Sequence, residues 1–237
     1  MKPNNLFNEL ILTLGLLLLL SIAWPLLTQI NSSPIPAQFV LNKNTLPDTY
    51  NPPFLSTQFA SHASSKEVHS ATAIELDNNN IMAFWYGGTR EGHKDVTIYQ
   101  NTWDNKTQQW GKEKSILSRA FTQQGTARYI RKLGNPVITR AADNSLWLFY
   151  VSVSVGGWAG SAINLTRSYD EGQSWSAAQR LISSPFLNIS TLVKGSAVHY
   201  TDGTIGLPVY HELLGKFAEL LKINPSGEVI NKIRLSW

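Results

Sequence analysis

The stretch from Ser168 to Trp175, with the sequence SYDEGQSW, constrains the fold of this chain more than any other. It fits the pattern S-x-D-x-G-x-x-W, in which each fixed residue has a mechanical role in a tight β-hairpin. The carboxylate of Asp170 can accept hydrogen bonds from turn N–H groups, Gly172 can adopt a positive φ, and the ring of Trp175 can fold back over the hairpin. The segments on either side are strand-like and can pair antiparallel. The stretch therefore predicts a hairpin whose turn is held by its own side chains.

This hairpin is part of a repeat. Three segments share an arrangement of two strand-like runs around a polar turn, and they span residues 70–86, 135–151 and 196–210. Each is followed by a second strand pair with the hairpin pattern or a remnant of it, over residues 96–110, 163–175 and 218–229. Four antiparallel strands in about 50 to 65 residues are typical of one propeller blade. Because a single blade cannot bury both of its faces, blades stack on one another, ordinarily in a closed ring. The chain from residue 61 onward is therefore predicted to be all-β, with about three four-stranded blades.

An apolar run from Leu6 to Ile30 precedes the repeats. About 20 apolar residues at a rise of about 1.5 Å each cross a bilayer as a helix. No clear signal-peptidase site follows the run. We therefore expect residues 1–30 to form an N-terminal hydrophobic helix that anchors the protein, with Lys2 inside and the bulk exported. The alternative is a cleaved signal peptide, which would make the protein secreted. Residues 31–60, rich in proline, are predicted to be an extended linker, and residues 61–237 the blades.

Charge and composition limit the classes of partner. The chain carries 20 Lys and Arg against 16 Asp and Glu, a net charge of +4, without a basic run. Nucleic-acid binding therefore has little support, whereas an acidic small substrate and a membrane surface suit the balance equally well. The absence of cysteine is compatible with export. Residues 211–215, HELLG, lack the second histidine of a zinc motif, so no metal and no cofactor are expected.

Several stretches together resemble the sialidase superfamily, in its bacterial branch with Asp-box (BNR) repeats. The matching stretches are HSAT at 69–72, WYGGTREG at 85–92 with Asp95 after it, GNPV at 134–137, the Asp-box at 168–175 and PVYHE at 208–212. The resemblance covers roughly residues 68–237. It implies the N-terminal half of a six-bladed β-propeller whose active site lies at the central axis on one face. It also implies exo-α-sialidase activity on glycans with terminal acidic sugars.

The resemblance implies roles for particular residues. Sialidases hold the substrate carboxylate with an arginine triad and use an aspartate as acid/base and a tyrosine, activated by a glutamate, as nucleophile. Asp95 matches the acid/base position; alternatively, it caps the turn before the next strand or pairs with Lys94 or Arg90. Arg90 is a candidate for binding the substrate carboxylate, or a solvated loop charge. The nucleophilic tyrosine, its glutamate and the remaining arginines would lie in blades beyond Trp237, and no residue here is assigned to those roles.

The chain departs from the sialidase pattern at His69, which stands where the first triad arginine is expected. A histidine cannot supply the planar set of N–H donors with which an arginine binds both oxygens of a carboxylate. His69 is therefore a candidate for binding a different sugar or acid, or an ordinary strand-edge histidine.

Other candidates lie at the ends of inner strands. His211 and Glu212 could contact substrate hydroxyls or could be a solvated strand end. Trp158, in a glycine-rich loop, could stack on a sugar face. The four fixed residues of the Asp-box are expected to be structural, namely Ser168, Asp170, Gly172 and Trp175.

Two functions are therefore open from the sequence. The first is an exported, membrane-tethered glycoside hydrolase of the exo-α-sialidase type, with a glycan substrate, a membrane contact through residues 6–30 and no nucleic-acid partner. The second is a non-catalytic carbohydrate-binding propeller or an inactive half-propeller, which the histidine at position 69 favours.

Overall fold

The computed structural model of the chain describes residues 9–19, 55–62, 64–184 and 188–235. Contacts divide the chain into a unit of Met1–Ala37 and a unit of Gln38–Trp237. In the first unit, residues 9–19 are helical. Within the described residues, no helix is long and apolar enough to cross a membrane. The rest of the predicted anchor and most of the predicted linker lie outside the described residues.

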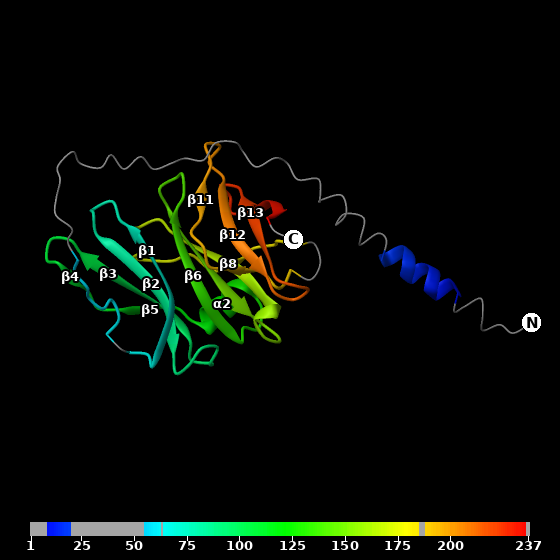
Figure 1. Cartoon of the computed structure of the whole chain (residues 1–237), viewed down its shortest axis with the longest axis horizontal. Coiled ribbons are helices and arrows are strands. Elements are labelled where there is room, and N and C mark those ends of the chain that lie inside the picture. Colours follow the sequence, from blue (N-terminus) through cyan, green and yellow to red (C-terminus); the bar gives the residue numbers. More distant parts are fainter. Residues whose placement is uncertain (1–8, 20–54, 63, 185–187, 236–237) are drawn as a thin grey trace, which may run out of the picture. The chain divides into compact units, whose positions relative to one another are not determined.

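The second unit consists of three antiparallel sheets (Figure 1). The first sheet contains β1 (Glu67–Glu75), β2 (Ile81–Gly88), β3 (Thr97–Asp104) and β4 (Gln109–Trp110), and β5 (Lys114–Leu117) also pairs with β3. The second contains β6 (Lys132–Arg140), β7 (Leu146–Val153), β8 (Ser161–Ser168) and β9 (Gln179–Arg180). In the third, β10 (Leu192–Val193) and β11 (Val198–His199) both pair with β12 (Ile205–His211), followed by β13 (Phe217–Ile223) and β14 (Val229–Arg234). The predicted all-β repeat is confirmed.

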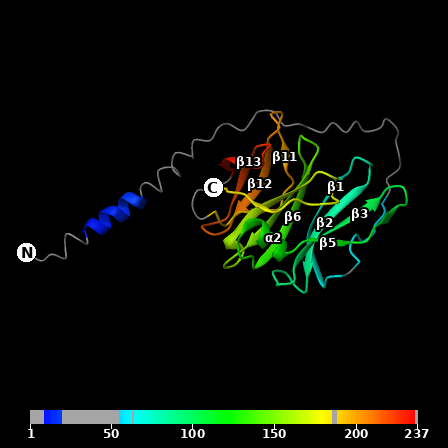
Figure 2. The ribbon, with the colours of Figure 1, turned by 180° about the vertical axis from the view of Figure 1, so that it is seen from behind.

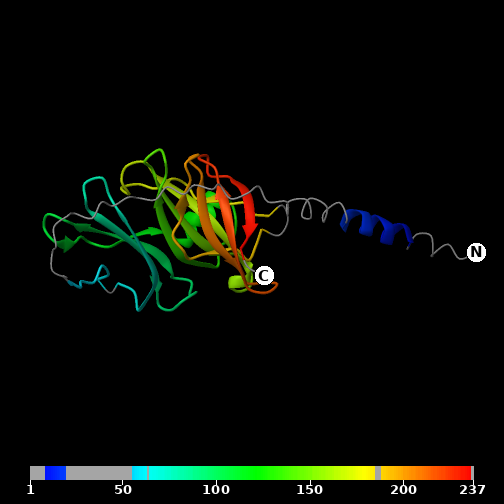
Figure 3. The same ribbon diagram turned by 45° about the horizontal axis from the view of Figure 1, so that its top comes forward.

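The sheets stack face to face in sequence order, as Figure 3 shows from the first sheet in cyan and green to the third in orange. All residues of β7 are buried, because its two faces contact different neighbours. Leu148 and Tyr150 pack in one core with Phe84 and Ile98 of the first sheet. Residues on the opposite face of β7, among them Phe149, pack in a second core with residues of the third sheet. This stacking is expected of adjacent propeller blades; the described residues do not close a ring, and ring closure stays a prediction.

One short helix, α2 (Arg119–Thr126), was not predicted from the sequence. Its N-cap is Ser118, whose hydroxyl accepts a hydrogen bond from the backbone N–H of Phe121 at 3.1 Å. Phe121 packs against the core shared by the first and second sheets. Figure 2, which views the stack from behind, shows α2 beside the second sheet. A helix of two turns carries too little periodic signal to be recognised, and only its cap could have indicated it.

The inner strands of the first two sheets carry a bulge at the same place. The register of β1 against β2 shifts between His69 and Thr72, and that of β6 against β7 shifts between Gly134 and Val137. Ser70 and Asn135, which lie within these shifts, have positive φ values of 51° and 45°. A bulge bends the strand and changes the direction of its side chains, and bulges are frequent beside functional sites.

The Asp-box forms the turn that the pattern predicted. The backbone N–H of Ser174 and the hydroxyl of Ser168 both donate to Oδ1 of Asp170, at 2.9 and 2.7 Å. The hydrogen bond from the hydroxyl of Ser174, followed by those from the backbone of Ser174 and the hydroxyl of Ser168, lowers the pKa of Asp170 to about 2. Gly172 has φ of 79°, a conformation that residues with a Cβ rarely adopt. Asp170 is thus fully engaged in the turn.

The Asp-box also joins two sheets. The indole N–H of Trp175 donates to Oε1 of Gln100 at 3.0 Å, and the amide of Gln100 donates to the carbonyl of Gly172 at 2.9 Å. The ring of Trp175 packs edge-on against Phe84, with centroids 5.6 Å apart. Because Gln100 and Phe84 belong to the first sheet, Trp175 contacts the neighbouring sheet, which the sequence did not predict.

A second link between these sheets lies beside the Asp-box turn. The guanidinium of Arg140 donates to both carboxylate oxygens of Glu171, at 2.6 and 3.0 Å, and to the carbonyl of Glu75 at 3.1 Å. The carboxylate of Glu171 also accepts the backbone N–H of Asp77 at 3.2 Å. Its hydrogen bonds with Arg140 are the largest cause of a lowered pKa at Glu171.

We predict that Gln100→Ala lowers the free energy of unfolding by about 1–3 kcal/mol, because the indole of Trp175 and the carbonyl of Gly172 lose their partner. Chemical denaturation followed by tryptophan fluorescence measures the change. Gln109→Ala, at an exposed position of β4, is the matched control and should cost little. Equal losses in the two variants would contradict the inter-sheet role of Gln100.

We predict that Glu171→Gln destabilises the protein at pH 7 by about 1–3 kcal/mol, since the bidentate ion pair is lost. A carboxyl whose pKa is lowered on folding stabilises the native state above its unfolded pKa of about 4.3, and this contribution disappears as pH falls through the folded pKa. The difference between wild type and variant should therefore be constant at neutral pH and shrink below about pH 4. Denaturation curves across this range, with Glu75→Gln as the control, test it. A difference that does not depend on pH would show that the carboxylate charge is not involved.

Candidate functional site

Polar and aromatic side chains of all three sheets gather at one edge of the stack, which we call the loop edge. β1 and β6 begin at this edge, and β2, β7 and β12 end there. The loop after β2 and the short 3₁₀ helix η1 (Trp158–Gly160) lie at this edge, on the lower side of the view in Figure 1. In the sialidase-like arrangement expected from the sequence, this is where the loops of the inner strands meet.

The first sheet contributes a histidine and a tyrosine in contact. His69 in β1 pairs with Tyr86 in β2, and their rings stack with centroids 5.4 Å apart. The Nε2 atom of His69 lies 3.5 Å from a carboxylate oxygen of Glu67. That same oxygen accepts the backbone N–H of Glu91 at 3.0 Å, so the loop after β2 is fixed to the start of β1.

The phenol of Tyr86 is the centre of the cluster. Tyr86 is buried, and burial followed by the nearby carboxylate of Glu91 raises its pKa above the ordinary tyrosine value. The hydroxyl of Ser70 also faces this phenol, and it donates to the side-chain oxygen of Asn135 at 3.2 Å. The bulges in β1 and β6 therefore bring one side chain from each of two sheets together beside Tyr86.

The third sheet contributes a second phenol. Burial, followed by the carboxylate of Glu212, raises the pKa of Tyr210, whereas a hydrogen bond with Asn135 lowers it. The carboxylate of Glu91 contributes to the raised pKa of both phenols, and Tyr210 contributes to that of Tyr86. The two phenols therefore share one electrostatic environment. The cluster thus combines two phenols, an amide and two carboxylates from different sheets.

Trp158 closes the side of the cluster formed by the second sheet. A Cβ atom added at Gly134 would lie 2.9 Å from the Trp158 ring and 3.6 Å from Tyr86, so the glycine is required for this approach. The ammonium of Lys132 lies over the ring of Trp158, 5.5 Å from its centroid. The predicted loop tryptophan therefore reaches the cluster.

Asp95 makes its contacts within its own loop. Its carboxylate accepts the backbone N–H and the hydroxyl of Thr89, and Nδ1 of His93 lies 2.6 Å away. The carboxyl is exposed, and the hydrogen bonds from Thr89 and then His93 hold its pKa well below the usual range. A general acid needs a proton at working pH, so this arrangement corresponds to the alternative of a turn cap, and the acid/base role stays a prediction.

The remaining predicted residues lie at different distances from the cluster. Arg90 is exposed on the loop, where its carbonyl accepts the backbone N–H of His93.

His211 stacks on Phe217 with centroids 4.6 Å apart, and its Nε2 accepts the backbone N–H of Leu214. Because neighbouring residues of a strand point to opposite faces, His211 and Tyr210 diverge. Glu212 reaches the cluster, and its backbone N–H donates to the hydroxyl of Ser190 at 2.8 Å.

Sequence reasoning missed most of the polar groups at the centre of the cluster. Tyr86, Asn135 and Tyr210 lie inside stretches that resemble sialidases, yet the sequence analysis assigned them only to strands of the repeat. Ser70 and Asn135 have positive φ within the two bulges, and neither residue type requires that conformation, so the bulges could not be predicted from the sequence. A search for polar residues at equivalent places in each repeat is the signal that could have found them.

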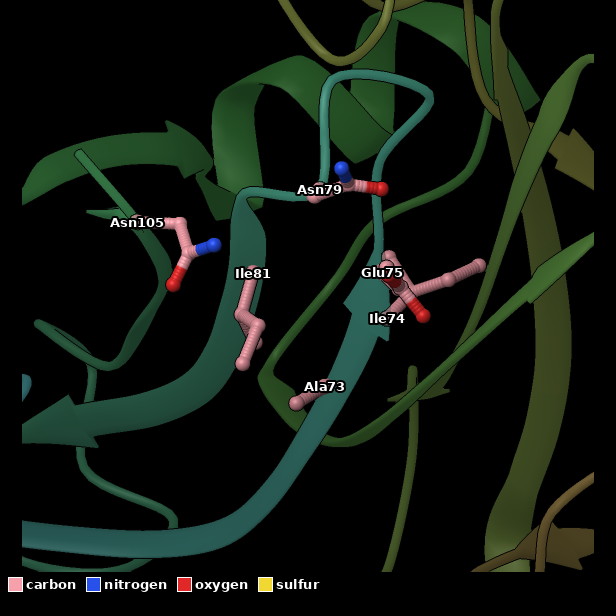
Figure 4. Close-up of a pocket in the computed structure, with 6 residues that line it drawn as sticks. All are labelled: Ala73, Ile74, Glu75, Asn79, Ile81 and Asn105. Atoms are coloured by element: carbon pink, nitrogen blue, oxygen red, sulfur yellow. The ribbon is translucent and has the colours of Figure 1, made fainter. Parts of the chain in front are cut away.

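The open pocket in Figure 4 lies elsewhere. It has a volume of about 580 Å³ and lies toward the opposite end of the β1–β2 hairpin from the loop edge, lined by Ala73, Ile74, Glu75, Asn79, Ile81 and Asn105. Glu75 is the one titratable group in this lining, so the pocket holds no acid–base pair. Nor do the described parts of the chain contain a group of three or more His, Asp or Glu placed to hold a metal ion.

Comparisons with known proteins agree with the repeat. The model of the BNR repeat-like domain family matches residues 79–236. No curated protein matches the chain significantly. Among solved structures, the Hadza microbial sialidase Hz136 is similar at 14% identity and a TM-score of 0.56, covering 71% of this chain and 38% of that one. The NanB sialidase from Streptococcus pneumoniae is similar at 10% identity and a TM-score of 0.58, covering 81% of this chain and 47% of that one.

A third similar structure is the intramolecular trans-sialidase from Ruminococcus gnavus, at 12% identity and a TM-score of 0.54, with 75% of this chain and 63% of that chain covered. The chain spans between 38% and 63% of the length of these three proteins. At such identities the likeness shows the fold alone.

We predict that Glu91→Gln lowers the pKa of Tyr86 toward the ordinary tyrosine value, because a negative charge that disfavours the phenolate is removed. The backbone N–H of residue 91 still donates to Glu67, so the loop should keep its place. NMR titration of ring-labelled tyrosine, with Tyr86→Phe to assign the signal, measures the shift. Glu75→Gln, on the same strand as Glu67 but at its other end, should leave the titration unchanged. The cluster geometry would be wrong if both glutamine variants behaved alike.

Proposed function

The chain belongs to the BNR repeat-like domain family, and on that premise we propose that it acts on terminal sugars of glycans, as a glycoside hydrolase with the sialidase fold. The observation that carries the proposal is the convergence of Tyr86, Asn135 and Tyr210, one from each sheet, at the loop edge. Clusters of this kind, with aromatic walls and a few converging polar groups, are typical of small-molecule sites.

The proposed roles follow from the chemistry of each group. Trp158 stacks on one face of the sugar ring, while the amide of Asn135 and the carboxylates of Glu91 and Glu212 bind hydroxyl groups. An acidic terminal sugar, expected from the resemblance, would depend on Arg90 and Lys132, the cations that border this cluster on the first and second sheets.

Asp95 is the proposed acid/base. It lies on the same loop as Glu91, and a loop position lets it turn toward a bound glycan. To protonate a leaving group it must exchange its bonds with Thr89 and His93 for a site from which water is excluded, since these bonds favour the ionised form.

A second function, carbohydrate binding without catalysis, is favoured by the hydrogen bonds that Asp95 makes. The carboxylate of Asp95 is already satisfied by Thr89 and His93, as in a turn cap. The histidine at position 69, where the resemblance places an arginine, also favours binding without catalysis.

We also propose that the sheets are exported and held at a membrane by the N-terminal apolar run. Support for this comes from the sequence of residues 6–30 and from the absence of cysteine.

We predict that Asp95→Asn lowers kcat by about 10²–10⁴-fold on any glycoside that the wild-type protein hydrolyses, because general acid–base catalysis contributes that much. Release of 4-methylumbelliferone from sialic acid and neutral sugar glycosides provides the assay. Asp104→Asn is the matched control, because Asp104 also caps an exposed turn, accepting the N–H groups of Lys106 and Thr107. Unchanged rates in the Asp95 variant would remove its catalytic role; a wild-type protein that binds glycans but releases no product would establish the second function.

A further inference from the structure

A further pocket lies at the outermost strands of the first sheet. It has a volume of about 730 Å³, within the range of about 300–1,000 Å³ that is typical of small-molecule sites. Its lining consists of His62 and Ser64 before β1, Tyr99 in β3 and residues 110–113 from β4 onward. β4 is the last strand of this sheet and β1 the first (Figure 1). The pocket therefore shares no residue with the cluster at the loop edge, and one sheet with the segment before it is enough to build it.

The two aromatic residues of the lining are each supported by another ring. Tyr99 stacks on Trp85, with centroids 6.0 Å apart and planes at 15°, and Trp110 meets Trp103 edge-on at 5.7 Å. Trp85 is buried, whereas Tyr99 and Trp110 are half-buried and line the pocket. Because this support restricts the rotamers of both rings, a ligand would meet ring surfaces that are already in place.

The segment before β1 is tied to the first sheet at two places. The carboxylate of Glu113 accepts the backbone N–H groups of His62 and Ser64 at 3.1 and 3.2 Å, and it also accepts the hydroxyl of Ser64. The side-chain amide of Asn101, in β3, donates to the carbonyl of Ala60 at 2.7 Å. The part of the lining that this segment contributes is therefore fixed by hydrogen bonds.

The lining joins apolar ring faces to polar groups that can bind a ligand. The rings of Tyr99 and Trp110 offer apolar faces for the C–H groups of a sugar. The side chains of Lys112 and His62 are exposed, and neither has a hydrogen-bond partner within the described residues. An ammonium donates to hydroxyl oxygens, and a neutral imidazole both donates and accepts. A pyranose has an apolar face and a rim of hydroxyl groups, so it matches both parts of the lining.

We propose that this pocket is a second carbohydrate-binding site, in which a pyranose ring packs on Tyr99 and Trp110 and its hydroxyl groups bind Lys112 and His62. The inference goes beyond the function proposed for the loop edge, because it requires neither catalysis nor any residue of that cluster. A glycan long enough to reach both sites would bind more tightly than through either site alone.

The test uses the full 237-residue chain labelled with 5-fluorotryptophan, in a detergent without a sugar head group. The chain has eight tryptophans, and Trp110→Phe identifies the ¹⁹F NMR signal of Trp110. The ligands are lactose, maltose, cellobiose and N,N′-diacetylchitobiose. We expect a saturable shift of the Trp110 signal with at least one of them. No shift with any of the four overturns the proposal.

Adenosine is the control ligand, because it can stack on an aromatic ring but contains no pyranose. It should shift the Trp110 signal less, at equal concentration, than the best disaccharide. An equal or larger shift with adenosine would show stacking without sugar recognition and would overturn the assignment to carbohydrate.

Variants test the assigned residues. Tyr99→Ala should weaken binding about fivefold, which is the contribution expected of an aromatic contact. Lys112→Ala, at an exposed position, should also weaken binding and keeps the test valid if Tyr99→Ala fails to fold, which thermal melting shows. Tyr169→Ala, at an exposed tyrosine of the Asp-box turn, is the matched control and should leave the affinity unchanged. Unchanged affinity in the folded Tyr99 and Lys112 variants overturns the assignment.

Trp158→Ala separates this site from the loop edge. The variant should leave the titration of the Trp110 signal unchanged, and loss of the shift would show that the two places are not separate sites. A Trp110 shift in a protein that hydrolyses no glycoside supports the second site and counts against the hydrolase function. Hydrolysis without a Trp110 shift gives the opposite result.

Discussion

The structure depends on the way in which the outer hairpin of each sheet is fastened to the sheet before it. The Asp-box of the second sheet is held on the first through Gln100, which bonds both Trp175 and the carbonyl of Gly172. The third sheet repeats this arrangement with different groups: the guanidinium of Arg167 lies over Trp147 and donates to the carbonyl of Ser226 at 2.7 Å. In both places a turn of one sheet meets a polar side chain of the previous one. These directional hydrogen bonds add to the two apolar cores in defining the relative position of the sheets.

Fixed sheets bring the inner strands together at the loop edge. Ser70 and Asn135 lie in the bulges of the two inner strands, and the hydroxyl of Ser70 donates to the side-chain oxygen of Asn135. Tyr210 completes the cluster from the third sheet. The polar groups that matter for a ligand are therefore separated by long stretches of sequence and meet only because the sheets are stacked in register. The open pocket of the β1–β2 hairpin, in contrast, is local and contains a single titratable group, Glu75.

The strands were predictable because turn chemistry and strand alternation are local. Asp-Gly and Asn-rich turns mark where the hairpins reverse, and the apolar runs between them are long enough to span a buried sheet. The short helix α2 and the strand β5 were missed, since each has too few residues for a period to be recognised. Trp175 shows a different limit. Its place in the pattern indicated packing on its own hairpin, but the ring contacts Phe84 of the neighbouring sheet, which no local rule specifies.

The sequence by itself determined the repeat of four-stranded sheets, the geometry of the Asp-box turn and the family, because these follow from short-range patterns of residue type. It also identified His69 and Glu212, near strand ends, and Trp158 in the loop after β7. Only the tertiary structure decided that Tyr86, Asn135 and Tyr210 face one another, and that Asp95 is held by Thr89 and His93. The physical reason is that charge, burial and hydrogen bonding at a site depend on distances between sheets, and the sequence specifies these distances only through the whole packed fold.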